Sequence, residues 1–404
     1  MGMSNLGNKR ILLGITGGIA AYKSAVLVCE LQRHGSDVQV IMTESACRFV
    51  TPVTMQALSG KPVFTDMWDS RVPNGMPHIE LSRDRDMIVV APATAGFITK
   101  LVHGAANDLL SAVCLARECP LLVAPAMNRQ MWENPATQRN IAQLRQDGIV
   151  VLGPEAGDQA CGETGMGRML EPADLARSIA AWFQPRLLAG TRMLITAGPT
   201  FEPIDPVRGI TNRSSGKMGY AVARAALEAG AQVTLVSGPV SIEAPSSAQL
   251  VRVETAREML DAVNANVGSC DIFVGVAAVA DYHVGNRKQQ KIKKGGAIPT
   301  LELVQNADII ESVAKRAHPP FCVGFAAESE NLEQNAEAKR RRKKLPLLAA
   351  NLVQSALGAD DNELVLFDDD GVHPLGRASK LELARALIRH IAKLYRPRNT
   401  SVTA

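Results

Sequence analysis

Short apolar segments rich in isoleucine and valine alternate with amphipathic helical patterns along the first half of the chain. Uninterrupted apolar segments are typical of strands that are buried on both faces of a parallel sheet. The alternation therefore predicts a doubly wound α/β domain with right-handed crossovers. The predicted strands are residues 11–16, 38–42, 87–91, 121–124 and 149–152, with helices at 20–34 and 107–117.

The same alternation begins again in the second half. Residues 182–190 (WFQPRLLAG) close a helix with proline and glycine, so we place the boundary between domains 1–189 and 190–404. A length of 404 residues also favours two domains. The predicted fold class is α/β, with two doubly wound Rossmann-like domains. The second set of strands is residues 193–197, 233–236, 272–276, 321–324 and 364–367, with helices at 219–229, 256–266, 307–316 and 332–344.

Composition and charge exclude several classes of protein. The hydrophobic content is 46%, the charged content is 21% and the formal net charge is only +4, so neither a nucleic-acid nor a membrane partner is predicted. No segment reaches the roughly 18 uninterrupted apolar residues of a membrane helix. The seven cysteines are scattered without zinc-site spacing, which favours a reducing cytoplasm.

Polar and small residues follow the predicted strands of the first half, where ligands bind in a doubly wound sheet. They are Gly17, Gly18, Thr43, Thr94 and Asn128. The segment GITGGIAAYK is a glycine-rich turn from strand to helix, whose amides and helix dipole can hold a phosphate. Its spacing departs from G-x-G-x-x-G, so a mononucleotide phosphate is favoured over NAD, and a tight packing turn is the structural alternative.

Two further side chains of the first half have both a chemical and a structural interpretation. His78 has Asn74, Gly75 and Pro77 as neighbours, which predicts a loop, and a histidine there can titrate near neutral pH and act as a base. A purely structural histidine is the equal alternative. Asn128 can orient a carboxylate or an amide, or it can cap a helix.

Cys161 lies in the glycine-rich segment GDQACGETGMGR, residues 157–168. Segments of this kind commonly serve as mobile flaps. A cysteine there is accessible, whereas the apolar neighbours of Cys114 and Cys322 predict core thiols. Cys161 is therefore the cysteine that we expect to take part in chemistry.

The second half has an unusually long connection between a strand and a helix at residues 198–219. Within it, NRSSGKMG begins at Asn212 and predicts a phosphate-binding helix start, with a turn and cap as the structural alternative. Asp281 follows a buried strand, where it can meet a sugar hydroxyl or a metal, or cap a turn. Lys339 and Lys343 share one helical face, as a triphosphate clamp requires, although such basic runs are usually a solvated surface.

Five spaced motifs of the first half resemble the flavin-dependent cysteine decarboxylases, specifically phosphopantothenoylcysteine decarboxylase. In chain order the motifs are GGIAAYK (17–23), PH (77–78), PATA (92–95), PAMN (125–128) and ACGETGMGRM (160–169). The resemblance implies that FMN oxidises the substrate thiol to a thioaldehyde, which lets carbon dioxide leave, and then returns the electrons.

The resemblance also implies a role for each matching residue. His78 would assist the oxidative decarboxylation, Asn128 would bind the substrate carboxylate and Cys161 would supply a proton. Many members of the family have an asparagine where this chain has Gly96, so that flavin contact is missing here. The predicted flavin contacts are Gly17, Gly18, Thr43 and Thr94.

Six motifs of the second half are similar to phosphopantothenate–cysteine ligase. They are NRSSGKMG (212–219), AAVADY (277–282), KIKK (291–294), NADI (306–309), GFAAE (324–328) and AN (350–351). Residues 10–395 as a whole resemble the bifunctional enzymes of coenzyme A biosynthesis, which carry both activities.

In the ligase family CTP activates the carboxylate of 4′-phosphopantothenate as an acyl-cytidylate, and the amine of cysteine then attacks. The departing pyrophosphate requires cations, and Mg²⁺ is expected with CTP, although its ligands cannot be identified from the sequence. The resemblance also implies a homo-oligomer with flavin sites shared between subunits. Carried over residue by residue, Lys291, Lys339 and Lys343 would meet the phosphates, Asn212 the acyl-cytidylate, and Asp281, Asn306, Ala307, Asp308, Ile309 and Phe325 the nucleotide.

Two other classes of protein are compatible with parts of the pattern. The glycine-rich turns alone would permit a two-domain NAD(P)-dependent oxidoreductase. The basic run at residues 339–344 would permit a nucleic-acid-binding module, whose affinity would fall steeply with salt.

Overall fold

The computed structural model describes most of the chain. The described residues are 6–72, 75–160, 162–245, 247–293, 300–328, 330–352 and 361–396.

The chain folds as two compact units that divide between Gln184 and Pro185. This division and the one predicted at 189/190 lie in the same connection between the last helix of the first unit and the first strand of the second. Leu188 is buried and its N–H donates to the carbonyl oxygen of Ala229. The end of the connection therefore packs with the second unit.

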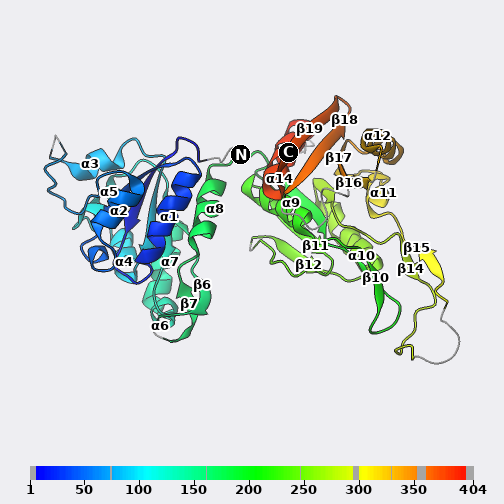
Figure 1. The fold of residues 1–404 in the computed structure, drawn as a ribbon, viewed down its shortest axis with the longest axis horizontal. Helices are drawn as coiled ribbons and strands as arrows, with labels where there is room; N and C mark the ends of the chain where they lie inside the picture. The colour runs from blue at the N-terminus through cyan, green and yellow to red at the C-terminus, as the bar shows by residue number, and fades with distance from the viewer. Residues whose placement is uncertain are drawn as a thin grey trace, which may run out of the picture. The chain divides into compact units, whose positions relative to one another are not determined.

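The first unit is built on a five-stranded parallel sheet with the order β2-β1-β3-β4-β5 (Figure 1). β1 pairs with both β2 and β3, so the direction of winding reverses between β1 and β3. The five strands that the sequence predicts are all present. Their bounds are β1 (Arg10–Ile15), β2 (Asp37–Met42), β3 (Met87–Ala93), β4 (Leu121–Pro125) and β5 (Val150–Val151).

Helices cover both faces of this sheet, as a doubly wound fold requires. The core on one face includes residues from α1 and α8, and the core on the other face includes residues from α4, α5 and α7. The helices are α1 (Ala21–Arg33), α2 (Pro52–Ser59), α3 (Pro77–Ser82), α4 (Ala95–His103), α5 (Leu109–Ala116), α6 (Arg129–Glu133), α7 (Pro135–Gln146) and α8 (Pro172–Trp182), with a 3-10 turn, η1, at Ala46–Arg48.

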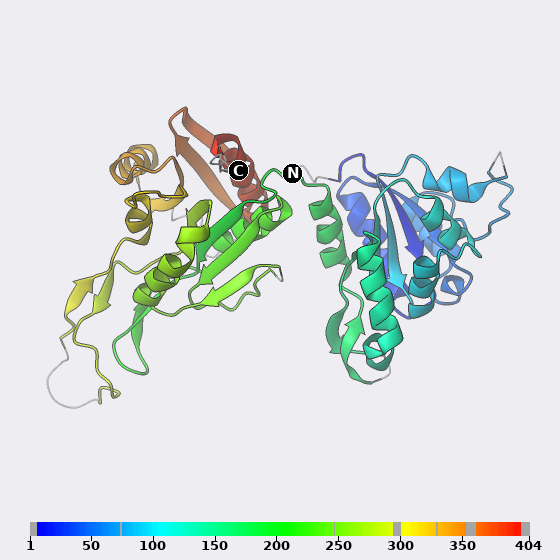
Figure 2. The ribbon, with the colours of Figure 1, turned by 180° about the vertical axis from the view of Figure 1, so that it is seen from behind.

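The glycine-rich segment that the sequence predicts as a flap forms an antiparallel hairpin of β6 (Glu155–Asp158) and β7 (Thr164–Arg168). The hairpin lies beside α6 (Figure 2). It is therefore attached at the carboxyl edge of the parallel sheet, where α6 begins.

The second unit has an eight-stranded sheet with the order β12-β11-β8-β13-β16-β17-β18-β19. The first six strands are parallel, whereas β18 and β19 are antiparallel. The sequence patterns predict β8, β11, β13, β16 and β18 but not the other three. The strands are β8 (Arg192–Ala197), β11 (Gln232–Ser237), β12 (Gln249–Arg252), β13 (Ile272–Gly275), β16 (Phe321–Glu328), β17 (Leu347–Leu352), β18 (Asp361–Asp368) and β19 (Gly371–Ser379).

Helices also cover both faces of the second sheet. α9 and α14 share one core, and α10, α11 and α12 contribute to the other. α14 was not predicted from the sequence. The helices are α9 (Lys217–Glu228), α10 (Ala256–Asn266), α11 (Ile309–Ala314), α12 (Leu332–Lys343) and α14 (Lys380–Leu394), with a 3-10 turn, η2, at Val267–Ser269.

The long connection that precedes α9 is partly ordered as a hairpin of β9 (Phe201–Pro203) and β10 (Gly209–Thr211). A second hairpin, β14 (Tyr282–Val284) with β15 (Leu303–Gln305), lies beside it, and Figures 1 and 2 show both projecting from the sheet. α9 then packs very closely on β8, because a Cβ added at Gly219 would lie 2.5 Å from the Cβ of Ala197.

Candidate functional site

A cavity of about 660 Å³ opens at the carboxyl edge of the first sheet. It lies at the point where the winding reverses between β1 and β3, which is where ligands bind in this class of fold. Apolar side chains such as Ile19 and Met131 form much of its wall. Four of the predicted site residues line it: Gly17, Gly18, Thr94 and Asn128.

The turn between β1 and α1 forms one side of this cavity, and hydrogen bonds hold it to the end of β3. The hydroxyl of Thr16 donates to the carbonyl of Pro92 (2.7 Å) and accepts from the N–H of Thr94 (3.1 Å). A Cβ added at Gly17 would lie 2.3 Å from the Cβ of Ser45, whereas one at Gly18 would meet only the methyl of Thr94, at 3.8 Å. The turn is thus closely packed behind and open toward the cavity.

Thr94 and Gly96 lie at the start of α4. The hydroxyl of Thr94 accepts from the N–H of Phe97 (3.3 Å) and so caps the helix. Nothing lies within 4 Å of a Cβ added at Gly96. Glycine at this position is therefore not required by packing.

Asn128 caps α6 and lines the same cavity. Its Oδ1 accepts from the N–H of Met131 (3.0 Å) and its Nδ2 donates to Oε1 of Gln130 (2.7 Å). The helix cap that the sequence offers as the structural alternative is thus present. The proposed contact with a substrate carboxylate remains a prediction.

Gln159 and Gly167 attach the β6–β7 hairpin to the start of α6. Oε1 of Gln159 accepts from the N–H of Arg129 (3.0 Å) and its Nε2 donates to the carbonyl of Met166 (3.1 Å). The N–H of Met127 donates to the carbonyl of Gly167 (3.0 Å). Gly167 has a φ of +130°, and a Cβ there would lie 2.3 Å from the carbonyl oxygen of Met127. Only glycine allows this approach.

Lys23 is a buried lysine at the edge of the cavity. Its Nζ donates to the carbonyl of Met169 (2.9 Å) and to Oε1 of Glu171 (2.9 Å), which joins α1 to the chain after the hairpin. The hydrogen bond from Lys23 is the main cause of a lowered pKa at Glu171. Lys23 was not predicted as a site residue, although a lysine on the apolar face of an amphipathic helix is a signal that the sequence contains.

Among the described residues of the first unit, two predicted site residues, Thr43 and His78, do not line the cavity. Thr43 accepts from the N–H of Ala46 (3.2 Å) in the turn after β2. His78 is half-buried in the first turn of α3, and Figures 1 and 2 show α3 far from α6 and the hairpin. The prediction of a loop at His78 is therefore wrong, because Pro77 at the first helical position favours the helix that Gly75 seemed to exclude. Cys161 lies outside the described residues.

The two cysteines predicted as core thiols are confirmed. Cys114 is fully buried and Cys322 is 2% exposed. Burial raises the pKa of each thiol to about 12. Both groups are therefore neutral and unreactive at physiological pH.

A cavity of about 210 Å³ in the second unit, which we call the α11–α12 cavity, lies between the strand ends and these two helices. It brings together the residues that the resemblance associates with the nucleotide. They are Asp281, Asn306, Ala307, Asp308, Ile309, Phe325, Lys339 and Lys343.

The charged groups of this cavity are partly paired. Asp308 caps α11 by accepting from the N–H of Glu311 (3.0 Å) and forms an ion pair with Lys343. Burial raises the pKa of Asp308, but the hydrogen bond from Lys343 and the nearby charges outweigh it and lower the pKa below its usual value. Burial and the charge of Lys343 lower the pKa of Lys339. The two ammonium groups together favour an anionic ligand.

Asn306 holds the backbone that carries Asp281. Its Nδ2 donates to the carbonyl of Ala280 (2.8 Å), and its Oδ1 lies 2.8 Å from Nδ1 of His283. Its N–H donates to the carbonyl of Asp281 (2.8 Å). The hydrogen bonds of Asn306 thus hold the backbone around Asp281 in place, whereas the side chain of Asp281 is exposed in the cavity.

A second cavity, of about 560 Å³, surrounds the start of α9 and is called the α9 cavity here. The side chain of Asn212 lines it and donates from Nδ2 to the carbonyl of Ala278 (2.8 Å). Ala277, Val279 and Phe325 line both cavities of this unit. The two cavities therefore share a wall.

The α9 cavity includes Asn362 and Lys380, which were not predicted, and Asn351, which was noted only as part of the AN motif and was given no role. Asn351 belongs to β17, and Lys380 begins α14, and neither element was predicted. Asn362 lies near the start of β18, outside the predicted bounds of that strand. No local pattern marks these residues as neighbours of Asn212, because only strand pairing across the sheet brings them there.

Lys291 is exposed and lines neither cavity. The next residue is anchored: the N–H of Ile292 donates to Oδ2 of Asp205 (3.1 Å), and Arg208 donates from Nη2 to the carbonyl of Ile292 (2.9 Å). Hydrogen bonds from Arg208 hold the pKa of the buried Asp205 far below its usual range. The β9–β10 hairpin thus sets the place of Lys291.

In the part of the chain that the structure describes, no helix combines the length and the apolar character needed to cross a membrane.

Two family models match consecutive parts of the chain. The Flavoprotein model matches residues 3–184, and the model of the DNA/pantothenate metabolism flavoprotein C-terminal domain matches residues 188–395. The coenzyme A biosynthesis bifunctional protein CoaBC of Vibrio vulnificus is 48% identical over 398 residues, which cover 97% of this chain and 99% of that protein. The chain belongs to the family of bifunctional coenzyme A biosynthesis proteins.

Other members and solved structures are also similar. The CoaBC protein of Escherichia coli K12 is 46% identical over 403 residues, 98% of this chain and 99% of its own length. The crystal structure of the C-terminal domain of a CoaBC protein is 38% identical, with a TM-score of 0.45 over 52% of this chain and 97% of that chain. The FMN-dependent cysteine decarboxylase SpaF is 33% identical, with a TM-score of 0.38 over 44% of this chain and 99% of that chain.

Membership of this family confirms the resemblances noted in both halves of the sequence. The protein is a bifunctional enzyme of coenzyme A biosynthesis, in which a flavoprotein decarboxylase unit precedes a ligase unit. The interpretations as an NAD(P)-dependent oxidoreductase or as a nucleic-acid-binding module are set aside.

Proposed function

We propose that the second unit joins L-cysteine to 4′-phosphopantothenate with CTP, and that the first unit decarboxylates the product, 4′-phosphopantothenoylcysteine, with FMN. The observation that carries the ligase assignment is that eight predicted nucleotide residues surround the α11–α12 cavity. This cavity shares a wall with the cavity that contains Asn212. A nucleotide and an acyl group can therefore be held side by side.

FMN fits the cavity of the first unit. The glycine turn at Gly17 and Gly18 is open toward the cavity at the N-terminal side of α1, which suits a phosphate, and the apolar walls suit a planar ring. We assign the phosphate to this turn and the ring to the wall that contains Ile19 and Met131. When bound, the flavin supplies an electron sink that accepts an electron pair from the substrate and later returns it.

The side chains of this unit orient the substrate. Asn128 uses one Nδ2 hydrogen for Gln130 and one lone pair of Oδ1 for the cap, so the second hydrogen remains to bind the carboxylate that is lost. The β6–β7 hairpin, held to α6 by Gln159, lines one side of the cavity. We assign proton donation in the reductive step to Cys161, on the strength of the family motif.

His78 lies outside the cavity of its own chain, in α3. We therefore propose a homo-oligomer in which His78 of the partner subunit completes the decarboxylase site. This arrangement agrees with the shared flavin sites that the family resemblance implies.

In the ligase, Lys339 and Lys343 bind the phosphates of CTP. Asp308 holds Lys343 in place, and the repulsion between the two lysines is relieved when a triphosphate binds between them. Mg²⁺ usually takes one or two carboxylates together with substrate phosphates. The exposed Asp281 is the candidate ligand in this cavity.

The α9 cavity takes 4′-phosphopantothenate, and its positive side chains Arg213, Lys217 and Lys380 suit the phosphate. A carboxylate oxygen of the substrate attacks the α-phosphorus of CTP, and pyrophosphate leaves. Asn212 at the shared wall holds the resulting acyl-cytidylate. The amine of cysteine then attacks the acyl carbon, loses a proton and displaces cytidine monophosphate.

We also propose a cytoplasmic location. The six described cysteines are all free, as expected in a reducing compartment.

The direct test supplies the full-length protein with 4′-phosphopantothenate, cysteine and CTP, and follows pyrophosphate and carbon dioxide separately. We expect pyrophosphate to require CTP and Mg²⁺, and carbon dioxide to require flavin. The variant His78→Asn should lose carbon dioxide release and keep pyrophosphate release. Loss of both in a folded variant would contradict the separation of the two sites.

The shared site is tested by mixing two inactive variants, His78→Asn and Asn128→Asp, under conditions that exchange subunits. If the partner subunit's His78 completes each cavity, some sites regain both native residues and carbon dioxide release returns in part. A mixture that exchanges subunits and stays inactive would overturn the shared site while leaving the chemistry untouched.

A further inference from the structure

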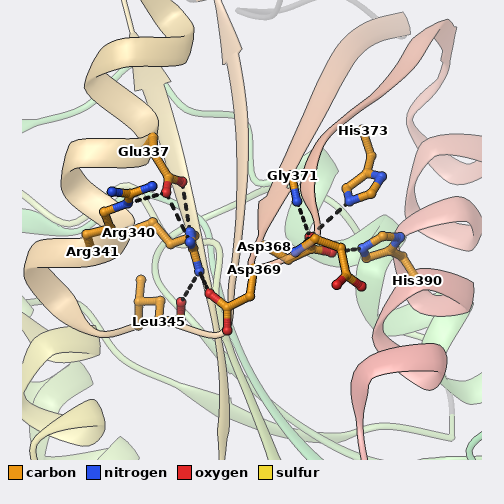
Figure 3. Close-up of polar contacts among 10 residues, drawn as sticks. Glu337, Arg340, Arg341, Leu345, Asp368, Asp369, Gly371, His373 and His390 are labelled. Carbon is orange, nitrogen blue, oxygen red and sulfur yellow. Dashed lines mark hydrogen bonds and ion pairs between the residues drawn. The ribbon is translucent and has the colours of Figure 1, made fainter.

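The turn between β18 and β19 carries a cluster of one aspartate and two histidines that the proposed reactions do not use. Asp368 ends β18, His373 lies on β19 and His390 lies on α14 (Figure 3). Within the described ranges, these three residues are the group whose potential metal-ligand atoms all lie within 4.8 Å of one another. The cluster joins three separate elements of the fold.

Both imidazole rings direct Nε2 toward the same carboxylate. Nε2 of His390 lies 2.6 Å from Oδ2 of Asp368, and Nε2 of His373 lies 2.9 Å from Oδ1. Nitrogen and oxygen ligands of a tetrahedral Zn²⁺ lie about 2.0 to 2.2 Å from the ion, and hence about 3.3 Å from one another. Small movements of the side chains would therefore make room for an ion.

The carboxylate of Asp368 is held in a fixed orientation. Its side chain is 2% exposed, and Oδ1 also accepts from the N–H groups of Asp370 (2.9 Å) and Gly371 (3.1 Å). Hydrogen bonds of this kind orient the carboxylates that bind metals in proteins. They occupy Oδ1, so Oδ2 is the oxygen that can bind an ion.

The next residue, Asp369, is anchored independently of the histidines. Nη1 of Arg340 donates to Oδ1 of Asp369 (2.7 Å), and Nε of Arg340 donates to Oε2 of Glu337 (2.8 Å). Figure 3 shows this network on the α12 side of the turn. Contacts that involve neither His373 nor His390 thus hold the residue that follows Asp368.

The cluster is accessible from solvent and suits a particular class of ion. The side chains of His373 and His390 are 35% and 15% exposed, so an ion can enter and keep a water ligand. Imidazole ligands suit Zn²⁺ and its neighbours, whereas Mg²⁺ prefers oxygen atoms alone. The cluster therefore differs in chemistry from the Mg²⁺ that accompanies CTP.

We propose that Asp368, His373 and His390 bind one divalent transition-metal ion of the Zn²⁺ class, through Oδ2 and the two Nε2 atoms, with water in the remaining position. The ion braces β18 and β19 against α14. The opposite ends of β18 and α14 carry Asn362 and Lys380 into the α9 cavity. Its role is to stabilise the elements that build this cavity, not to act on the substrate.

The test uses the full-length protein after treatment with a chelator and dialysis. Zn²⁺ titrated by calorimetry should bind at one ion per chain and raise the thermal unfolding midpoint of the second unit. Co²⁺ should give the visible absorption bands of a site with nitrogen and oxygen ligands, beyond the flavin bands. Mg²⁺ should give none of these effects.

The variants His390→Gln and His373→Gln keep a side-chain N–H but remove the imidazole. Loss of a second-shell partner weakens metal binding by about 10- to 100-fold, so loss of either ligand should weaken Zn²⁺ binding by more than about 100-fold. The matched control is His318→Gln, an exposed histidine of the same unit, which should bind Zn²⁺ as the unmodified protein does. Equal affinity in all three variants would overturn the proposal.

A second measurement needs no variant. Bound Zn²⁺ should protect His373 and His390 from modification by diethylpyrocarbonate, mapped by mass spectrometry, and leave His318 reactive. Modification of all three histidines at unchanged rates under saturating Zn²⁺ would show that the cluster is only a carboxylate hydrogen-bonded to two imidazoles and does not bind a metal.

Discussion

The two units assemble their candidate sites differently. In the second unit, eight residues predicted from the sequence surround one cavity and a ninth, Asn212, lines the cavity next to it. In the first unit four predicted residues line one cavity, while His78 lies in α3, away from it. The ligase residues come from the loop after β13, the start of α11 and α12 of the same unit, so a single chain brings them together. By contrast, the decarboxylase motif that contains His78 lies on α3, which does not line the cavity of the first unit.

The largest expected effect comes from Asn212→Asp. The substitution replaces the N–H that donates to the carbonyl of Ala278 with a carboxylate oxygen, and it places a negative charge beside an anionic intermediate. Loss of a side-chain donor that stabilises developing charge typically lowers the rate by about 100- to 1000-fold. Pyrophosphate release should fall by this factor, while decarboxylation of supplied 4′-phosphopantothenoylcysteine should continue.

The matched control for this variant is Asn264→Asp. Asn264 accepts from Nη2 of Arg316 on the surface, and a carboxylate can do the same, so neither activity should change. Normal ligation by Asn212→Asp would show that Asn212 is not part of the ligase site. The second unit would then, like the first, have a predicted residue that lies outside its site.

The second prediction concerns the lysine pair. Lys339→Met removes one hydrogen bond to a charged group, worth about 1.5 to 3 kcal/mol, so the KM for CTP should rise by roughly 10- to 150-fold. Burial and Lys343 already lower the pKa of Lys339, so the variant should unfold at the same temperature or higher. Lys315→Met, at an exposed lysine paired with Glu311, is the control. An unchanged KM for CTP in Lys339→Met would show that Lys339 on α12 does not bind the phosphates of CTP.

The third prediction compares two glycines of the first unit. Gly167→Ala forces a side chain into a backbone conformation with φ of +130° and against the carbonyl of Met127, which should cost about 1 to 3 kcal/mol. Gly96→Ala adds a side chain where nothing lies within 4 Å and should stabilise α4 by up to about 1 kcal/mol. Thermal unfolding and the flavin content after purification measure both. Equal behaviour of the two variants would show that the hairpin is not held as described.

The smallest effect concerns the thiols. With pKa values raised to about 12, Cys114 and Cys322 hold the reactive thiolate only above that pH. At pH 8 the thiolate fraction is about one part in 10,000. Alkylation of the native protein, mapped by mass spectrometry, should spare both while Cys161 reacts. Labelling of Cys114 at the rate of Cys161 would contradict the distinction.

Much of the fold follows from local pattern. All five strands of the first sheet were predicted, because each is a continuous apolar segment between helical patterns. β19 was missed because its burial alternates along an edge of the sheet and Pro374 lies within it. The prediction of a loop at His78 was wrong because it relied on Asn74 and Gly75 as loop signals and overlooked that Pro77 favours the first position of a helix.

The sequence by itself determined the two α/β units, the strand-end motifs and the family, since these depend on residues that are close along the chain. Only the tertiary structure decided that Asn351, Asn362 and Lys380 join Asn212, and that Asp205 holds the segment of Lys291. It alone also brought His373 and His390 to Asp368. The physical reason is that these contacts depend on strand order and on packing between elements, which residue periodicity does not encode.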